Sequence, residues 1–139
     1  MSNLAVVSEY IARFSQMIGV PIPPPDADGY TQVARGSAII GINVLEQKGL
    51  LLFLAPVLDL NSVPASKKEA LYRRMLELNY LETEDGAFAI DQQSGKLFVR
   101  SLRGLEQLDF EEFVDLLDTV ARIADDWDDV LKAEFSSAS

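Results

Sequence analysis

The sequence predicts an α+β fold with the element order α-β-β-β-α-β-β-α, in which a twisted antiparallel sheet packs against helices. Apolar residues recur at steps of three and four near both ends and in the middle of the chain, the spacing of amphipathic helices. Short runs rich in β-branched and large apolar residues lie between these segments and are separated by turn residues. The 139 residues suit a single domain, expected over 1–135, followed by a disordered tail at 136–139.

The first expected helix begins after Ser2 or Asn3, because either side chain can cap its free backbone N–H groups. Its apolar residues keep the helical period as far as Gly19, where the helix should stop. The run VPIPPPDADG at 20–29 cannot continue a helix, since proline lacks a backbone donor and restricts the residue before it. An exposed, extended connector is therefore expected there.

Three β-rich runs follow between Tyr30 and Leu58: TQVAR, SAIIGINVL and LLLFLAPVL. The segment EQKG at 46–49 predicts a hairpin turn between the second and third runs. Gly41 indicates a bulge or a close backbone approach, and Pro56 either closes the third run or confines it to a sheet edge. The second and third runs are so continuously apolar that both of their faces should be covered, by the helices of the protein or by a partner.

Ser66 and Glu69 form a capping box at the start of a second helix of about four turns. The apolar residues of this helix spread around more than half of its circumference, so one side needs a second cover. A twofold homodimer would supply that cover, and the alternative is that both sides lie in the core of the monomer. The predicted dimer interface comprises Leu71, Tyr72, Met75, Leu78 and Asn79.

A hairpin and a long helix complete the predicted fold. The runs AFAID and KLFVRSL flank a QQSG turn at 92–95, which is typical of two antiparallel strands. The last helix extends from Leu108 to Leu131, with Asp109 as its cap and Glu112 placed to reach back in a capping box. Residues 105–135 contain 11 acidic and 2 basic residues, a net charge of −9 out of −10 for the whole chain. The acidity of the protein is therefore local.

Composition restricts the possible functions. The chain has no cysteine, which excludes disulfides, thiolate metal sites and thiol catalysis, and no histidine, the commonest general base and metal ligand. A pI near 4.3 opposes binding to nucleic-acid phosphates and to anionic lipids. No apolar run approaches the roughly 20 residues that span a bilayer, and the N-terminus lacks the pattern of a signal peptide. We therefore expect a cytoplasmic protein without a nucleic-acid or membrane partner.

Candidate chemical sites are few. Four carboxylates near the end of the last helix can be interpreted as a cation site or as a solvated helix face: Asp125, Asp126, Asp128 and Asp129. A calcium loop of the EF-hand type would need a glycine at its turn, which this helix lacks. An acid–base site would need Asp91 or Glu106 beside Tyr72, Tyr80 or a lysine, and no motif brings these together. No phosphate-binding glycine loop is present either, so we expect no catalytic residue, cofactor or metal.

Four segments resemble the class I type III secretion chaperones (the CesT-like family), which are small acidic bacterial proteins of this element order. They are the helix end MLELNYL, the hairpin FAIDQQSGKLFVRSL, the closing helix LDFEEFVDLLDTVARIADDWDDVL and the strand LLFLAPV. The resemblance covers about residues 50–131 well and residues 1–49 mainly by element order. The fold also resembles that of the YbjN-like sensory-transduction regulators.

The resemblance implies a non-enzymatic cytoplasmic chaperone or adaptor that binds an extended segment of a partner, a secreted effector, through apolar grooves as a homodimer. In the family, the second helix and adjacent strands form the dimer contact, while the first helix and the exposed sheet face supply the grooves. Partner binding is accordingly assigned to Val7, Ile11, Phe14, Ile40, Ile42, Val44, Leu52 and Leu54. The alternatives are a regulatory or ligand-sensing domain of the YbjN-like type and a small enzyme.

Overall fold

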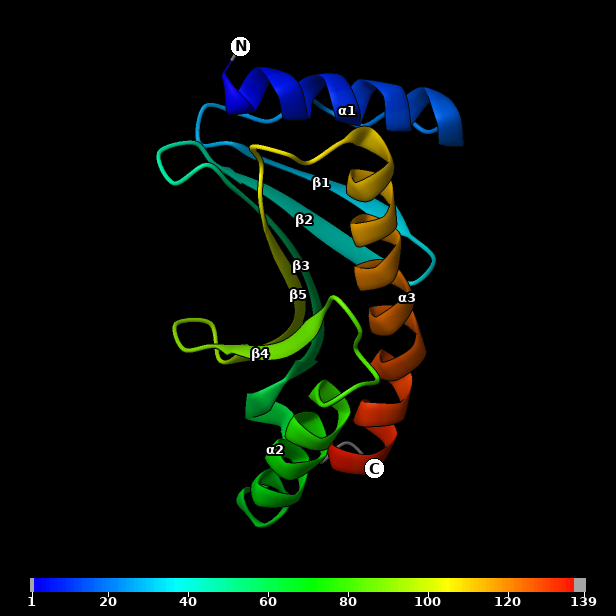
Figure 1. The fold of residues 1–139 in the computed structure, drawn as a ribbon. Coiled ribbons are helices and arrows are strands. Elements are labelled where there is room, and N and C mark those ends of the chain that lie inside the picture. The colour runs from blue at the N-terminus through cyan, green and yellow to red at the C-terminus, as the bar shows by residue number, and fades with distance from the viewer. Residues whose placement is uncertain (1, 137–139) are drawn as a thin grey trace.

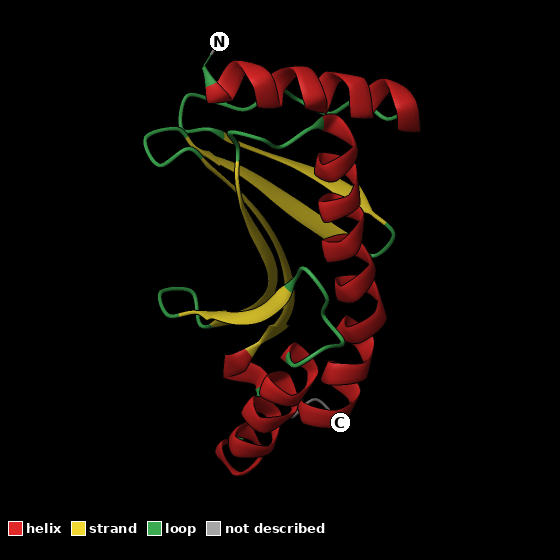
Figure 2. Cartoon of the chain, viewed as in Figure 1, coloured by secondary structure: helices red, strands yellow, loops and turns green. Residues whose placement is uncertain are grey.

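The structure, a computed structural model, describes residues 2–136. It confirms the predicted α+β class and element order (Figures 1 and 2). The elements are α1 (Asn3–Ile18), β1 (Tyr30–Arg35), β2 (Ala38–Leu45), β3 (Leu50–Asp59), a short 3-10 helix η1 (Leu60–Ser62), α2 (Ala65–Asn79), β4 (Ala87–Asp91), β5 (Lys96–Gly104) and α3 (Phe110–Phe135).

The five strands form one sheet in the order β1-β2-β3-β5-β4, and every neighbouring pair is antiparallel. Figure 1 shows α1 at one end of this curved sheet and α2 at the other, with α3 running between them. Helix α3 contacts β2, β3 and β5, whereas α2 contacts β4 and the end of α3. The helices therefore cover one face of the sheet.

Local signals in the sequence explain the ends of α1. The Ser2 hydroxyl accepts a hydrogen bond from the Ala5 N–H, so Ser2 is the cap of the two candidates. Gly19 adopts the left-handed conformation at φ 72°, and its N–H donates to the Ser15 carbonyl. Glycine takes this conformation without a Cβ clash, which explains why the helix ends there.

The starts of α2 and α3 differ from each other. Asp109 caps α3, because its Oδ1 accepts from the Glu112 N–H at 2.8 Å. The capping box predicted at Ser66 is wrong. Helix α2 begins one residue earlier, at Ala65, with Pro64 as its N-cap and no side-chain capping bond. Ser66 is already within the first turn, where its hydroxyl cannot serve the orphan N–H groups as an N-cap does.

One of the two alternatives predicted for Gly41 holds, whereas both alternatives predicted for Pro56 are wrong, because β3 lies between β2 and β5 in the sheet. Pro56 does not close β3, which continues to Asp59 with a register shift between Pro56 and Leu58. The pairing of β2 with β3 runs only from Leu45–Leu50 to Gly41–Leu54, so Pro56 lies beyond it. Its missing N–H is tolerated there because bulges and locally unpaired edges need fewer donors. Gly41 is a site of close approach, as described below.

The core lies between the sheet and α3. Phe113 is fully buried, with ring centroids 5.5 Å from Phe53 and 5.6 Å from Tyr10. The Tyr10 hydroxyl also donates to the Leu108 carbonyl at 2.9 Å. This aromatic cluster fixes α1 against the start of α3. Of the expected tail at 136–139, Ser136 ends α3 by donating its N–H to Lys132, and the remaining positions lie outside the described residues.

Candidate functional site

The sheet has one face that no helix covers, which we call the open face. It consists of the strand side chains that point away from α3. The register aligns one row of it across the whole sheet, from Gln32 through Gly41, Leu54 and Arg100 to Ala87. Its apolar members include Tyr30, Ile39, Leu52, Leu54, Pro56, Phe98 and Leu102. Ile39 is 51% exposed and Leu102 is 37% exposed.

Two adjacent hollows lie on the open face. The first, of about 300 Å³, is lined by Tyr30, Gln32, Ile39, Gly41, Asn43, Leu54, Pro56 and Phe98. The second, of about 330 Å³, is lined by Leu52, Leu54, Ala89, Ile90, Asp91, Phe98 and Arg100. Both share Leu54 and Phe98, so the hollows form one apolar strip across β1 to β4. This strip is therefore a candidate interaction site.

The structure separates the predicted partner-binding residues into two groups. Six of them are buried in the protein's own core: Val7, Ile11 and Phe14 of α1, and Ile40, Ile42 and Val44 of β2. The first three face the sheet and α3, and the other three point to the helix-covered side of β2. As placed, these six are closed to a partner. Leu52 and Leu54 are half-buried and lie on the open face.

The predicted dimer residues also divide. Leu71 and Met75 are buried, and Leu78 packs partly against the core. The Asn79 side chain bonds the backbone of β4, since its Oδ1 accepts from the Phe88 N–H at 2.8 Å and its Nδ2 donates to the Phe88 carbonyl at 3.2 Å. Tyr72 alone of the five is exposed, at 38%.

Sequence reasoning missed the residues that accompany Tyr72 on the outer side of α2. Leu76 is 72% exposed and Tyr80 is 84% exposed. With Tyr72 they follow at steps of four and therefore form one stripe along the helix. A shallow hollow of about 840 Å³ runs along this stripe and is also lined by Glu69, Arg73 and Glu77. The wide spread of apolar residues around this helix predicts that it has a second apolar side. The sequence pattern does not show which residues lie on the inner side of the helix and which on the outer side.

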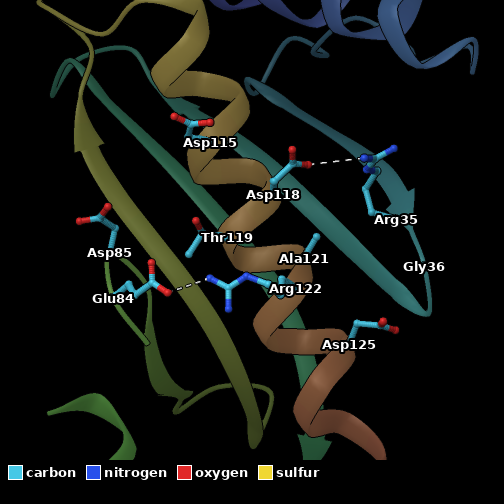
Figure 3. Close-up of a pocket in the computed structure, with 10 residues that line it drawn as sticks. All are labelled: Arg35, Gly36, Glu84, Asp85, Asp115, Asp118, Thr119, Ala121, Arg122 and Asp125. Atoms are coloured by element: carbon cyan, nitrogen blue, oxygen red, sulfur yellow. Dashed lines mark hydrogen bonds and ion pairs between the residues drawn. The ribbon is translucent and has the colours of Figure 1, made fainter. Parts of the chain in front are cut away.

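A charged hollow lies beside α3 (Figure 3). Its side chains project from α3, from the end of β1 and from the loop before β4. Arg35 pairs with Asp118 at 3.5 Å, and Arg122 pairs with Glu84 at 3.1 Å. Both ion pairs are largely exposed, and such pairs contribute little to stability. They connect α3 to segments that flank the sheet.

The acidic end of α3 holds the turn between β1 and β2. The Ser37 hydroxyl lies within hydrogen-bonding distance of Asp125 and Asp128, and the Ser37 N–H donates to Asp125 Oδ1 at 3.1 Å. The bonds from the Ser37 side chain and then from its backbone lower the pKa of Asp125 below its ordinary value. Asp125 therefore has a structural role, because it connects α3 to the turn between β1 and β2.

The candidate acid–base residues do not converge. Tyr72 and Tyr80 line the hollow on α2, Asp91 lines one on the open face, and Glu106 lines a third beside the end of β5. Hydrogen bonds from the Ser94 side chain and the Gln93 backbone lower the pKa of Asp91, as expected for a carboxylate that closes a turn. Within residues 2–136, no three acidic side chains are grouped so that they could hold a metal ion. The described helices are also too short or too polar to span a bilayer.

Comparisons with known proteins identify the fold. The chain has a TM-score of 0.78 and 22% identity to a chain of the crystal structure of the ExsC–ExsE complex, with 100% of both chains covered. It has a TM-score of 0.67 and 16% identity to a chain of the heterodimeric ExoU–SpcU complex from the type III secretion system of Pseudomonas aeruginosa, covering 91% and 98%. For YbjN, a putative transcription regulator from E. coli, the TM-score is 0.59 at 13% identity, covering 85% and 88%.

These likenesses define an α+β fold shared with chains of the two complexes and with YbjN. The sequence itself matches the Tir chaperone protein (CesT) family over residues 9–128, and the chain belongs to that family. This confirms the resemblance noted in the sequence. No curated protein matches the sequence.

Proposed function

We propose that this protein is a non-enzymatic cytoplasmic chaperone that binds an extended segment of a secreted effector on its open face and acts as a homodimer. The observation that carries the proposal is the apolar strip around Leu54 and Phe98, which spans the sheet and is left uncovered by every described helix. Membership of a chaperone family supports it. So does the similarity of the fold to a chain of the HopA1–SchA chaperone–effector complex.

The free edge of β1 offers a backbone contact for such a segment. The Val44 N–H donates to the Gly29 carbonyl at 2.8 Å. Counting from this pair, only every second residue of β1 forms backbone hydrogen bonds with β2, as in any antiparallel pair. Gln32 and Ala34 therefore turn their N–H and C=O groups outward, and no described residue bonds them. At the opposite edge, the Asn79 amide occupies the outward groups of Phe88. An added strand is thus favoured at β1 over β4.

The stripe on α2 fits a second copy of the chain. If two α2 helices pack antiparallel about a twofold axis at Leu76, this residue meets its own copy and Tyr72 lies opposite Tyr80 of the other chain. At about 100° per residue, Arg73 and Glu77 lie on the same side of the stripe. In an antiparallel pair that side meets itself, so each Arg73 lies near a Glu77 of the other chain. The surface is therefore complementary to itself in shape and in charge.

The alternative functions lack a comparable observation. A ligand-sensing domain would need an enclosed cavity, and the hollows described above are open to solvent. An enzyme would need titratable groups that share a pocket, but Asp91, Glu106 and the α2 tyrosines line separate hollows. The similarity to YbjN concerns the fold alone.

Replacing Leu54 by aspartate tests the proposal. The tagged protein and the variant are used to capture partners from the source bacterium, and the captured proteins are quantified by mass spectrometry. We expect the unaltered protein to retain a secreted protein that Leu54→Asp loses by at least about tenfold, because a carboxylate would be buried in an apolar contact. Binding should then be reproduced with a purified segment of that protein.

Val130→Asp is the matched control, since Val130 is 45% exposed on α3, away from the open face. It makes the same change of chemistry without touching the strip. Equal loss of the captured protein with both variants, or retention with Leu54→Asp, would contradict binding at the open face.

A further inference from the structure

The open face lacks a side chain at one position, Gly41. Gly41 pairs with Leu54 of the neighbouring strand, and as a glycine it places no side chain beside the Leu54 side chain. A Cβ added to Gly41 would lie 3.1 Å from Tyr30 Cε1 and 3.3 Å from the Tyr30 hydroxyl oxygen. The Tyr30 ring therefore lies over the glycine backbone, displaced from its own row, in which it faces Asn43.

The Tyr30 side chain makes one hydrogen bond in this position. Its hydroxyl donates to Gln32 Oε1 at 3.0 Å, along the same strand. The hollow is bordered by two aromatic rings, those of Tyr30 and Phe98, and by the Pro56 ring. The hollow of about 300 Å³ is therefore lined both by Gly41, which has no side chain, and by the Tyr30 ring that lies against it.

We infer that Gly41 and Tyr30 determine the specificity of the open face, by shaping a hollow that receives one aromatic side chain of the bound segment. This inference rests on the proposed function. Flat ring walls favour an aromatic occupant, because rings pack edge-to-face or offset against one another and bury a large area. The eight lining residues are all uncharged, although the chain carries 22 acidic residues, so an uncharged side chain suits this place on the surface.

The polar atoms at the rim agree with this assignment. The Tyr30 hydroxyl and the Gln32 side chain stand at one side of the hollow, and the Asn43 amide, which donates to the Leu52 carbonyl at 3.4 Å, lies on the neighbouring row. A bound tyrosine or tryptophan could reach these groups with its polar end while its ring is covered. Gln32 also belongs to the free edge of β1, which places the anchor side chain close to an added strand.

The test uses a phage-displayed library of random peptides of about 12 residues, selected on the immobilised full-length protein. Selected peptides are synthesised and their Kd values measured by fluorescence anisotropy. We expect the selected peptides to share one aromatic position whose replacement by alanine weakens binding by about 10–200-fold, the range for losing a well-packed apolar group. Peptides that share an aliphatic anchor, or no anchor, would overturn the inference.

Gly41→Val should weaken binding by at least about tenfold, because its side chain displaces the Tyr30 ring into the hollow. The loss of affinity on replacing the aromatic anchor should then shrink to about twofold or less in this variant. A merely destabilised protein would not abolish that coupling. Gly41→Ala gives a smaller, graded displacement, and it replaces the valine variant should the latter fail to fold.

Ala133→Val is the control, since Ala133 is exposed on α3, away from the open face, and the change likewise enlarges an apolar side chain. It should bind the peptides as the unaltered protein does. Leu54→Asp tests the proposed binding at the open face separately from the inference about Gly41 and Tyr30. If Leu54→Asp loses the peptides and Gly41→Val keeps them with the anchor effect intact, the inference is wrong and the proposed function stands. If both variants keep them, or no peptide is selected, the open face is not the binding surface.

Discussion

The dimer proposal makes a quantitative prediction for Leu76→Asp. Leu76 is 72% exposed in the monomer, and fully burying a leucine side chain is worth about 1.5–3 kcal/mol. Burial of the exposed part at the axis is therefore worth about 1–2 kcal/mol per chain, or about 2–4 kcal/mol per dimer. At 1.4 kcal/mol per factor of ten, losing this contact raises the dimer Kd by about 30- to 1,000-fold. Two aspartates that face each other would add repulsion.

Light scattering coupled to gel filtration measures this effect. The unaltered protein should have twice the chain mass of 15.4 kDa at tens of micromolar, and Leu76→Asp should have the mass of one chain with an unchanged circular dichroism spectrum. Ile39→Asp is the control, because Ile39 is 51% exposed on the open face of β2, away from α2. A monomeric unaltered protein, or a dimeric Leu76→Asp variant, would refute the reasoning. Met75→Glu would be unsuitable, since Met75 is buried and the change would unfold the chain.

Two further predictions concern stability. Phe113→Ala removes a fully buried ring that contacts Phe53 and Tyr10, and should cost about 3–5 kcal/mol, seen as a fall in Tm of about 10–20 °C; an unchanged Tm would place the ring outside the core. Asp125 has a lowered pKa in the folded state, so its stabilisation is complete above its unfolded pKa and is lost as the pH falls through the folded value. The Tm difference between the unaltered protein and Asp125→Asn should hold near neutral pH and shrink toward about pH 3. Ser37→Ala should reduce this pH dependence without abolishing it, because the backbone N–H of residue 37 still donates to Asp125.

The sequence was sufficient for the element order because helical and strand periods are local signals. Ser2, Gly19 and Asp109 mark helix ends by interactions within a few residues. Gly41 and Pro56 were recognised as irregular positions, but the form of each irregularity depends on neighbouring strands. A single sequence contains no direct record of those neighbours.

The candidate sites were harder to predict, because an apolar residue looks the same whether it faces a core or a partner. The stripe of Val7, Ile11 and Phe14 could be buried against any apolar surface, whether of this chain or of a partner. The structure shows that β2 and α3 supply that surface. In β2, Ile40 and Ile39 are adjacent and equally apolar, yet the first is buried and the second is 51% exposed. Period-two alternation predicts that they lie on opposite faces without saying which face is covered.

The placement of the two surfaces determines how binding and dimerisation relate. Helix α2 lies beside β4, at one end of the sheet order, while the free edge of β1 lies at the other end. A twofold contact through Leu76 therefore leaves both β1 edges at the outer ends of the dimer and covers neither hollow around Leu54. Because no residue lines both the α2 stripe and the open face, loss of the dimer does not remove a binding hollow. Dimerisation would then act on client binding by presenting two open faces to one extended chain, which raises the effective concentration of the second contact once the first has formed.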